Sequence, residues 1–281
     1  MASNSKTIIF DGKTAAQEIL FDLKKKIMTM AKKPGIAVIL VGDDRPSHIY
    51  VKNKEKASHF CGIRFHKYLM DENISETELL KCLNFLNEDP DVNAIVVQLP
   101  LPKKFNADKI IAAINPAKDA DGFHPETLKK IKEGKSKIKS ALIEAVEKIL
   151  CHWGQKLPGK KAILVSNCNL FGAAFKDELQ RLNIETEIVK TADKKLAEKT
   201  KKADILFAAV GKANFIKEEM VKEGAVVIDI GTSWIDKKFI GDVDFESVKK
   251  KASFIAPVPG GVGPMTVAML LNNVYKLSVK K

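Results

Sequence analysis

Short apolar runs alternate with amphipathic helical stretches along this chain, and no other feature of its 281 residues constrains the fold as strongly. In the first half, an amphipathic helix over residues 13–31 comes first. Strands and helices then alternate, with strands at residues 36–41, 63–68 and 94–98 and helices at about residues 47–59, 75–87 and 106–114. This strand–helix–strand order predicts a parallel sheet with right-handed crossover connections.

The second half of the chain repeats this architecture without repeating the sequence. A helix over residues 140–153 joins the two halves, and a last helix follows Pro264. The predicted strands are residues 162–165, 185–189, 205–209 and 225–230, and the helices lie near residues 172–181, 194–201 and 215–222. This pattern is typical of a Rossmann-type nucleotide-binding domain. We therefore predict an α/β protein with two parallel-sheet domains.

The composition argues against several other classes of protein. The net charge is +12, but Arg45, Arg64 and Arg181 are the only arginines, so lysines carry nearly all of the positive charge. Base readout and bidentate phosphate recognition favour arginine, so we predict a solvated lysine surface and no nucleic-acid partner. No apolar run reaches the ~18 residues of a membrane span, and the polar start lacks the apolar run of a signal peptide. We expect a cytoplasmic protein.

The cysteines and histidines have no spacing typical of a metal site. The four cysteines lie far apart without a CxxC pattern, so we expect neither a zinc site nor a disulfide framework. His124 lies close to Asp121 in the sequence, and we interpret it as an ordinary loop histidine.

Ser47, Tyr50 and Lys54 are the most informative candidates for a functional site. They follow the strand at residues 36–41 after a short turn, and Pro46 suits the first turn of a helix. Offsets of three and four residues place the three side chains on one face of that helix. A hydroxyl, an aromatic ring and an amine then lie at the carboxyl end of a strand, where open α/β sheets bind ligands. The alternative is a solvated helix face.

Three further segments give this helix a specific context. Residues 94–102 read Ala-Ile-Val-Val-Gln-Leu-Pro-Leu-Pro, residues 119–125 read Asp-Ala-Asp-Gly-Phe-His-Pro, and residues 257–266 read Pro-Val-Pro-Gly-Gly-Val-Gly-Pro-Met-Thr. Together with the helix that carries Tyr50 and Lys54, they closely resemble the bifunctional methylenetetrahydrofolate dehydrogenase/methenyltetrahydrofolate cyclohydrolase family. The resemblance covers nearly the whole chain in order, starting at Asp11-Gly12-Lys13, and its motifs are long and specific.

The resemblance implies two domains with a cleft between them. Residues 1–139, completed by a C-terminal helix over residues 266–281, would form the folate-binding catalytic domain, and residues 140–265 the Rossmann-type NAD(P)-binding domain. It also implies oxidation of 5,10-methylenetetrahydrofolate to 5,10-methenyltetrahydrofolate with NADP, followed by hydrolysis to 10-formyltetrahydrofolate. Because the family is commonly dimeric, we expect a homodimer that binds tetrahydrofolate derivatives and no metal.

The resemblance also assigns roles to individual residues, with Lys54, Tyr50, Gln98 and Asp121 as the expected catalytic set. Lys54 would transfer protons in the hydrolysis, which suits a lysine only when burial or a nearby positive charge lowers its pKa. Gln98 would hydrogen-bond this lysine, Tyr50 would stack on the folate rings, and Asp121 would bind donor groups of the pterin. Asp119 is more typical of a structural role. The expected substrate-binding residues are Ser47, Tyr50, Val97, Gln98, Leu99, Asp121, Pro259, Gly260, Gly261, Gly263 and Pro264.

The nucleotide half departs from the family pattern at three motifs. The usual Pro-Cys-Thr-Pro is replaced around residues 139–142, and an expected Ile-Asn pair reads Thr232-Ser233. Where the family carries Gly-Arg-Ser-x-x-Val-Gly-x-Pro, residues 166–174 read Ser-Asn-Cys-Asn-Leu-Phe-Gly-Ala-Ala. Asn167 thus replaces an arginine that would face the 2′-phosphate of NADP, while helix N-terminal amides at Gly172 would still hold a diphosphate. The expected cofactor is NADP, with NAD as the alternative, and the expected cofactor-binding residues are Ser166, Asn167, Cys168, Gly172, Lys190, Thr191 and Thr232.

Two alternatives to the bifunctional, NADP-linked enzyme stay open at this point. One keeps the folate site but uses NAD or performs only the hydrolysis. The other is a non-catalytic folate- or nucleotide-binding paralogue, or a basic RNA-binding protein on the same fold. The set of Tyr50, Lys54, Gln98 and Asp121 argues against the second, because a pure binding module does not need that lysine.

Overall fold

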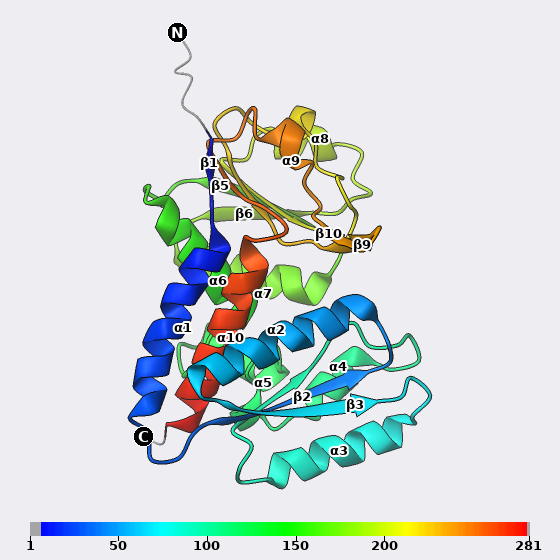
Figure 1. Cartoon of the computed structure of the whole chain (residues 1–281). Coiled ribbons are helices and arrows are strands. Elements are labelled where there is room, and N and C mark those ends of the chain that lie inside the picture. The colour runs from blue at the N-terminus through cyan, green and yellow to red at the C-terminus, as the bar shows by residue number, and fades with distance from the viewer. Residues whose placement is uncertain (1–6, 280–281) are drawn as a thin grey trace. The chain divides into compact units, whose positions relative to one another are not determined.

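The computed structural model describes residues 7–279, which divide into two compact units (Figure 1). The three-stranded unit comprises residues 16–144 and 266–279, and the six-stranded unit comprises residues 7–15 and 145–265. Each is named here after its main sheet. The chain passes from one unit to the other within the helices α1 (Gly12–Met28), α6 (Ala141–Trp153) and α10 (Val262–Ser278).

The three-stranded unit is built on a parallel sheet with the order β3-β2-β4, in agreement with the predicted strand–helix alternation. Its strands are β2 (Gly35–Val41), β3 (Arg64–Met70) and β4 (Ala94–Val97). The central strand β2 is buried along its whole length, as an all-apolar strand in a parallel sheet should be. The accompanying helices are α2 (Arg45–Cys61), α3 (Glu76–Glu88), α4 (Ala107–Ala112), α5 (Pro125–Lys132) and the 3-10 turn η1 (Pro116–Lys118).

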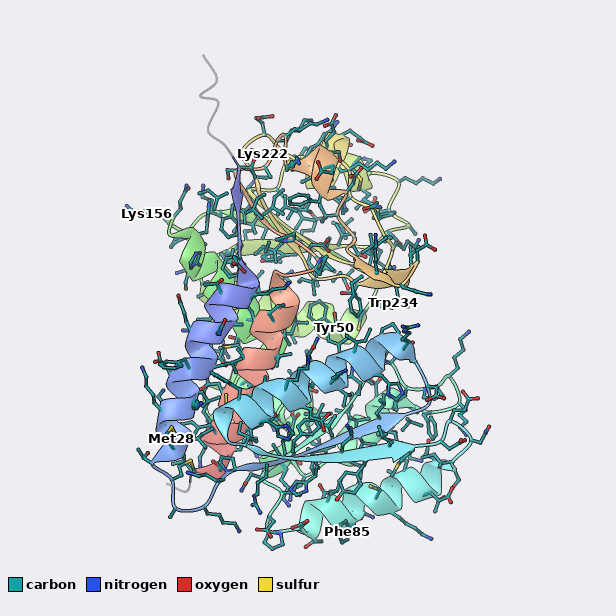
Figure 2. The ribbon with its side chains drawn as sticks, in the orientation of Figure 1. Met28, Tyr50, Phe85, Lys156, Lys222 and Trp234 are labelled. Carbon is teal, nitrogen blue, oxygen red and sulfur yellow. The ribbon has the colours of Figure 1, made fainter. Side chains whose placement is uncertain are left out.

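Helices α2 and α3 lie on opposite faces of this sheet (Figure 1). On α3, Leu79, Leu83 and Leu86 follow one another at spacings of four and three residues, so they form one apolar side. They join Ile95 of β4 in a single core cluster. Phe85 lies off this side of the helix and is exposed to solvent (Figure 2). Burying each of these leucines contributes roughly 1.5–3 kcal/mol.

Polar caps determine where the helices of this unit begin. At the start of α2, Asp44 accepts a hydrogen bond from the backbone N–H of Ser47, and Pro46 occupies the first turn. At the start of α3, Ser75 and Glu78 form the predicted capping box, in which each side chain accepts from the backbone N–H of the other. Both helix starts therefore lie close to the predicted ones.

The six-stranded unit holds a parallel sheet with the order β1-β11-β8-β7-β5-β6 among its described residues. The strands β5 (Lys161–Ser166), β6 (Glu185–Val189), β7 (Ile205–Ala209) and β8 (Val226–Asp229) agree with the predicted ones. Its α-helices include α7 (Asn169–Arg181), α8 (Leu196–Thr200) and α9 (Phe245–Val248). Because β5 lies between β6 and β7, the strand order reverses there, and such a switch point is where Rossmann-type sheets bind nucleotides. The predicted Rossmann-type architecture is confirmed.

Several short strands of this unit have no clear signal in the sequence. β1 (Ile8–Ile9) pairs in parallel with β11 (Phe254–Ala256), so residues 7–15 group with the six-stranded unit and not with the first half of the chain. β9 (Ser233–Ile235) and β10 (Lys238–Ile240) form a hairpin on which the ring of Trp234, labelled in Figure 2, packs edge-on against Phe239. Two or three residues are too short for a hydrophobic period to be detected.

The helix predicted near residues 215–222 is wrong, because only a 3-10 turn, η2 (Glu218–Met220), forms there. The backbone of Ile216 instead pairs with the segment around Val243: its N–H donates to Asp242 O, and its carbonyl accepts from Asp244 N. These long-range hydrogen bonds use the backbone groups that a helix would need. Tertiary pairing therefore overrides the local helical pattern.

Two features are absent from residues 7–279. No helix there is long and apolar enough to cross a membrane. No group of three or more histidine, cysteine or acidic side chains is arranged to hold a metal ion.

We expect Ser75→Ala to lower the free energy of unfolding by about 1 kcal/mol, because it removes the acceptor that caps the first turn of α3. Urea denaturation followed by circular dichroism measures the change. Thr77→Ala, at an exposed position of the same turn, is the matched control and should not destabilise, since alanine has the higher helix propensity. Equal losses in both variants would contradict the role of the cap.

Candidate active site

The amine of Lys54 and the amide of Gln98 form the centre of the candidate site in the three-stranded unit. Lys54 lies on α2, and its Nζ donates a hydrogen bond of 2.9 Å to Oε1 of Gln98, which follows β4 directly. Gln98 is only 9% exposed. Its Nε2 donates to the carbonyl of Leu99 at 2.7 Å, which leaves Oε1 oriented to accept from the lysine. The structure thus brings together two residues that are 44 positions apart in the sequence.

Asp121 is electrostatically coupled to Lys54. Burial lowers the pKa of Lys54, because it penalises the ammonium, and the negative charge of Asp121 opposes this shift. Burial also raises the pKa of Asp121, and the positive charge of Lys54 opposes that shift in turn. The proton affinities of the amine and the carboxyl are therefore closer than those of the free side chains. Such a pair favours proton transfer, because less free energy separates its protonation states.

Asp119 holds the loop that presents Asp121. Its buried carboxylate accepts from the backbone N–H of Gly122 at 3.0 Å and from that of His124 at 2.9 Å. Gly122 has a φ of +77°, and a Cβ there would lie 2.7 Å from the Cα of Ser140, so a glycine is required. The expected structural role of Asp119 is confirmed.

His124 also has a structural role, at the start of α5. Its Nδ1 accepts from the backbone N–H of Glu126 at 3.0 Å, so the ring acts as the helix N-cap. Its Nε2 lies 3.2 Å from the carbonyl of Ala112, within hydrogen-bond distance. The histidine therefore ties α5 to the end of α4.

Ser47 and Tyr50 lie on α2 with Lys54, as the spacing predicts, and Figure 2 labels Tyr50 on this helix. Ser47 is 1% exposed, and its hydroxyl donates to Oδ2 of Asp44 at 2.6 Å. This hydroxyl therefore contributes to the cap of the helix. A contact of Ser47 or Tyr50 with substrate stays a prediction.

In the six-stranded unit, the glycine-rich loop follows β11 and packs closely against the start of α1. A Cβ on Gly12 would lie 2.0 Å from the carbonyl oxygen of Gly261, and one on Gly261 would lie 2.6 Å from the carbonyl oxygen of Pro257. This close approach explains the glycine in Asp11-Gly12-Lys13. Helix α10 begins at Val262 and not after Pro264, so the loop is shorter than predicted. The structure tolerates this proline because the first helical turn needs no backbone N–H donor.

Five of the candidate cofactor residues, Ser166, Asn167, Cys168, Lys190 and Thr191, lie at the carboxyl ends of β5 and β6, whereas Thr232 follows β8. Asn167 follows β5, and its Oδ1 accepts from both the backbone N–H (3.2 Å) and the hydroxyl (3.1 Å) of Thr191, which follows β6. The hydroxyl of Ser166 is engaged nearby, since it accepts from the N–H of Cys168 at 3.2 Å. Lys190 is exposed beside this pair in the sequence. Strands β5 and β6 of the six-stranded unit thus both end in a polar cluster.

The role expected for Gly172 needs correction. Helix α7 begins at Asn169, and the N–H of Gly172 already donates to Cys168 O at 3.1 Å within it. This amide is therefore not available to a diphosphate. A Cβ on Gly172 would lie 3.2 Å from Cδ1 of Ile188, so the glycine lets the helix approach β6 closely. Close helix–strand packing is itself one of the uses of glycine in Rossmann-type units.

Sequence reasoning missed a pair of buried carboxylates in the six-stranded unit. Asp242 accepts from the backbone N–H groups of Val210, Gly211 and Lys212, and Asp229 accepts from those of Asp242 and Val243. Burial raises the pKa of Asp229 to about 8, and these N–H donors oppose the shift. The pair orders the loop that follows β7. The signal that could have indicated this pair is Asp229 itself, a charged residue at the end of the apolar run Val-Val-Ile-Asp.

Two family models match most of the chain. The model described as the catalytic domain of tetrahydrofolate dehydrogenase/cyclohydrolase matches residues 10–121, and the one described as its NAD(P)-binding domain matches residues 140–281. The bifunctional protein FolD of Nitratiruptor is 43% identical over 277 residues, which are 97% of this chain and 98% of that protein.

Solved structures agree with these matches. The bifunctional FolD methylenetetrahydrofolate dehydrogenase/cyclohydrolase of Campylobacter jejuni is 39% identical with a TM-score of 0.90, covering 96% of this chain and 98% of that one. The FolD enzyme of Trypanosoma brucei, solved with NADP and an inhibitor, is 30% identical with a TM-score of 0.92, covering 97% of each chain.

We expect Asp121→Asn to lower the pKa of Lys54 further, because it removes the negative charge that raises this pKa while burial still lowers it. The pH dependence of amine labelling, quantified for each peptide by mass spectrometry, measures the shift. Lys56, exposed on the same helix, is the internal reference. A labelling midpoint of Lys54 that stays unchanged or rises would contradict the coupling.

Proposed function

This chain belongs to the tetrahydrofolate dehydrogenase/cyclohydrolase family, and on this basis we propose that it interconverts one-carbon derivatives of tetrahydrofolate. It oxidises 5,10-methylenetetrahydrofolate to 5,10-methenyltetrahydrofolate with NADP and hydrolyses the product to 10-formyltetrahydrofolate. The hydrogen bond between Lys54 and Gln98, beside the charge of Asp121, carries this proposal. A pure binding protein would gain nothing from an amine whose pKa is lowered by burial.

The hydrolysis is the step that this chain's own side chains explain. Water adds to the cationic methenyl carbon and loses one proton. When the bond from this carbon to the ring nitrogen breaks, that nitrogen gains a proton, and the hydroxyl formed from water releases its remaining proton to solvent as it becomes the formyl oxygen. Lys54 takes the first proton as the free amine and returns it as the ammonium. Gln98 accepts a hydrogen bond from Nζ and so holds the amine in one place in both states. Asp121 binds the pterin through its carboxylate.

The polar cluster at the ends of β5 and β6 supports dinucleotide binding. NADP, when bound, accepts the hydride from the one-carbon bridge. The amide of Asn167 and the hydroxyl of Thr191 are hydrogen-bonded at the ends of β5 and β6, beside the switch point of a Rossmann-type sheet, where a ribose is expected. We propose that these residues and Lys190 contact the adenosine ribose, together with Ser166, Cys168 and Thr232.

Cofactor preference is the finer part of this proposal. Oδ1 of Asn167 is occupied by Thr191, so the group that Asn167 offers to a cofactor is its neutral NH₂. An arginine at this position would offer a charged and bidentate contact to a 2′-phosphate. We propose a weaker preference for NADP over NAD than is usual when an arginine is present.

Other expectations from the resemblance stay predictions. They include the substrate contacts of Val97 and Leu99 at the end of β4, the roles of residues 1–139 and 140–265 as folate and nucleotide domains, the homodimer and the cytoplasmic location. Light scattering of the purified protein tests the homodimer.

We expect Lys54→Met to keep the fold but to slow the hydrolysis of 5,10-methenyltetrahydrofolate by roughly 10²–10⁴-fold, because the proton-transfer group is lost while most of the aliphatic bulk is kept. Loss of the methenyl absorbance measures the rate. Lys56→Met, at an exposed position of the same helix, is the matched control and should hydrolyse at the rate of the unchanged protein. Hydrolysis by Lys54→Met at that rate would remove the lysine from the mechanism.

We expect Asn167→Arg to strengthen NADP binding relative to NAD by about one to two decades, since it restores a charge-assisted contact worth roughly 1.5–3 kcal/mol. Titration of the protein with each reduced cofactor, followed by cofactor fluorescence, measures both dissociation constants without catalysis. Lys190→Ala is the informative comparison. A strong NADP preference that Asn167→Arg does not increase and Lys190→Ala removes would place the phosphate on Lys190.

A further inference from the structure

Asn273 is a buried polar side chain on α10 that the reaction described above does not use. Its neighbours along the helix include Leu270, Leu271 and Val274, which are buried apolar residues, and Asn273 itself is 0% exposed. An amide in such surroundings is unfavourable unless it is hydrogen-bonded. Its presence in the apolar side of the helix therefore needs a specific partner.

The two partners are main-chain carbonyls from distant parts of the three-stranded unit. Nδ2 of Asn273 donates to Ala120 O at 2.9 Å and to Lys139 O at 2.8 Å. Ala120 comes directly before Asp121, and Lys139 ends the segment that contains α5. The side-chain amide of Asn273 therefore links the two ends of the segment formed by residues 121–138.

A second set of contacts connects the same two ends, at Asp121 and at the residues next to it. The carbonyl of Asp121 accepts from the N–H of Ala141 at 3.1 Å, and Gly122 packs against the backbone of Ser140. Asp119 holds the other side of the turn through the N–H of Gly122. The backbone of Asp121 is thus fixed between residues 119–120 and 139–141, and Asn273 contacts both of these segments.

We propose that Asn273 is a positioning residue, which acts through the Ala120 carbonyl to hold the Asp121 carboxylate where it binds the pterin and faces Lys54. This inference rests on the proposed function. A leucine of similar size would fill the same space but would remove the N–H groups that donate to the carbonyls of Ala120 and Lys139, so the link between these two segments would be lost. A side chain that only fills the volume of Asn273 would therefore not keep Asp121 in place.

The experiment compares Asn273→Ala with the unchanged protein in the hydrolysis of 5,10-methenyltetrahydrofolate. We expect KM to rise by roughly tenfold, the size of effect that about 1.4 kcal/mol of lost binding produces. We also expect the acidic limb of the pH–rate profile to move to lower pH, because Asp121 raises the pKa of Lys54 when it is held close. The dissociation constant of NADP should change less than about twofold.

Two variants of the same helix separate positioning from stability. Val274→Ala removes buried apolar volume next to Asn273 and lowers the melting temperature without touching the two carbonyls. Asn272→Ala changes the same residue type at a half-buried neighbouring position. Both should keep the KM and the pH–rate profile of the unchanged protein. Where Asn273→Ala melts below the assay temperature, Asn273→Ser decides, with an intermediate KM expected because its hydroxyl can satisfy one carbonyl.

Three results would overturn the inference. A KM within about twofold and an unmoved acidic limb in Asn273→Ala or Asn273→Ser would show that Asp121 stays in place without the amide. An equal rise of KM in Val274→Ala would show that lost stability alone is responsible. A protein that neither binds nor hydrolyses the folate would overturn the proposed function and this inference with it, whereas the first two results leave the proposed function intact.

Discussion

The burial of the Lys54 amine is the constraint on which the candidate site of the three-stranded unit depends. A buried ammonium is costly, so its neighbours must be held at fixed positions before they can compensate. Gln98 is held in position because its Nε2 donates to the carbonyl of Leu99. Asp121 compensates for the burial of the ammonium through its negative charge. These residues come from a helix, a strand end and a loop. The parallel sheet brings them together, because the carboxyl ends of its strands share one edge.

The two units stabilise their functional edges by the same physical means. In each, a buried polar side chain replaces water as the partner of loop backbone groups. Asp242 accepts from three successive N–H groups after β7, whereas Asn273 donates to two carbonyls around Asp121. A carboxylate suits a cluster of donors and an amide NH₂ suits a pair of acceptors. The hydrogen-bonding groups of each side chain therefore match those that the loop backbone presents.

Local signals predicted the strands β2 to β8 and the capping box of α3, because strand runs and caps depend on neighbouring residues. They failed at Ile216, whose backbone pairs with a distant segment, and at the start of α7. They also gave no hint of Asn273, whose partners lie 153 and 134 residues away in the chain. The hydrogen bond between Lys54 and Gln98 was expected from the family resemblance, since no periodicity connects the two residues.

The segment from Asp119 to His124 contains both structural residues and a residue with a proposed chemical role. Asp119 uses its two oxygens on the loop's own N–H groups, Gly122 is required by its positive φ and the nearby Ser140, and His124 caps α5. Asp121 is the residue of this motif whose side-chain charge acts on Lys54. A substitution at Asp119 or Gly122 would therefore disturb the site through the backbone, while one at Asp121 acts on its charge directly. Within one short motif, some residues therefore hold the backbone of the loop, and Asp121 acts on the site through its side chain.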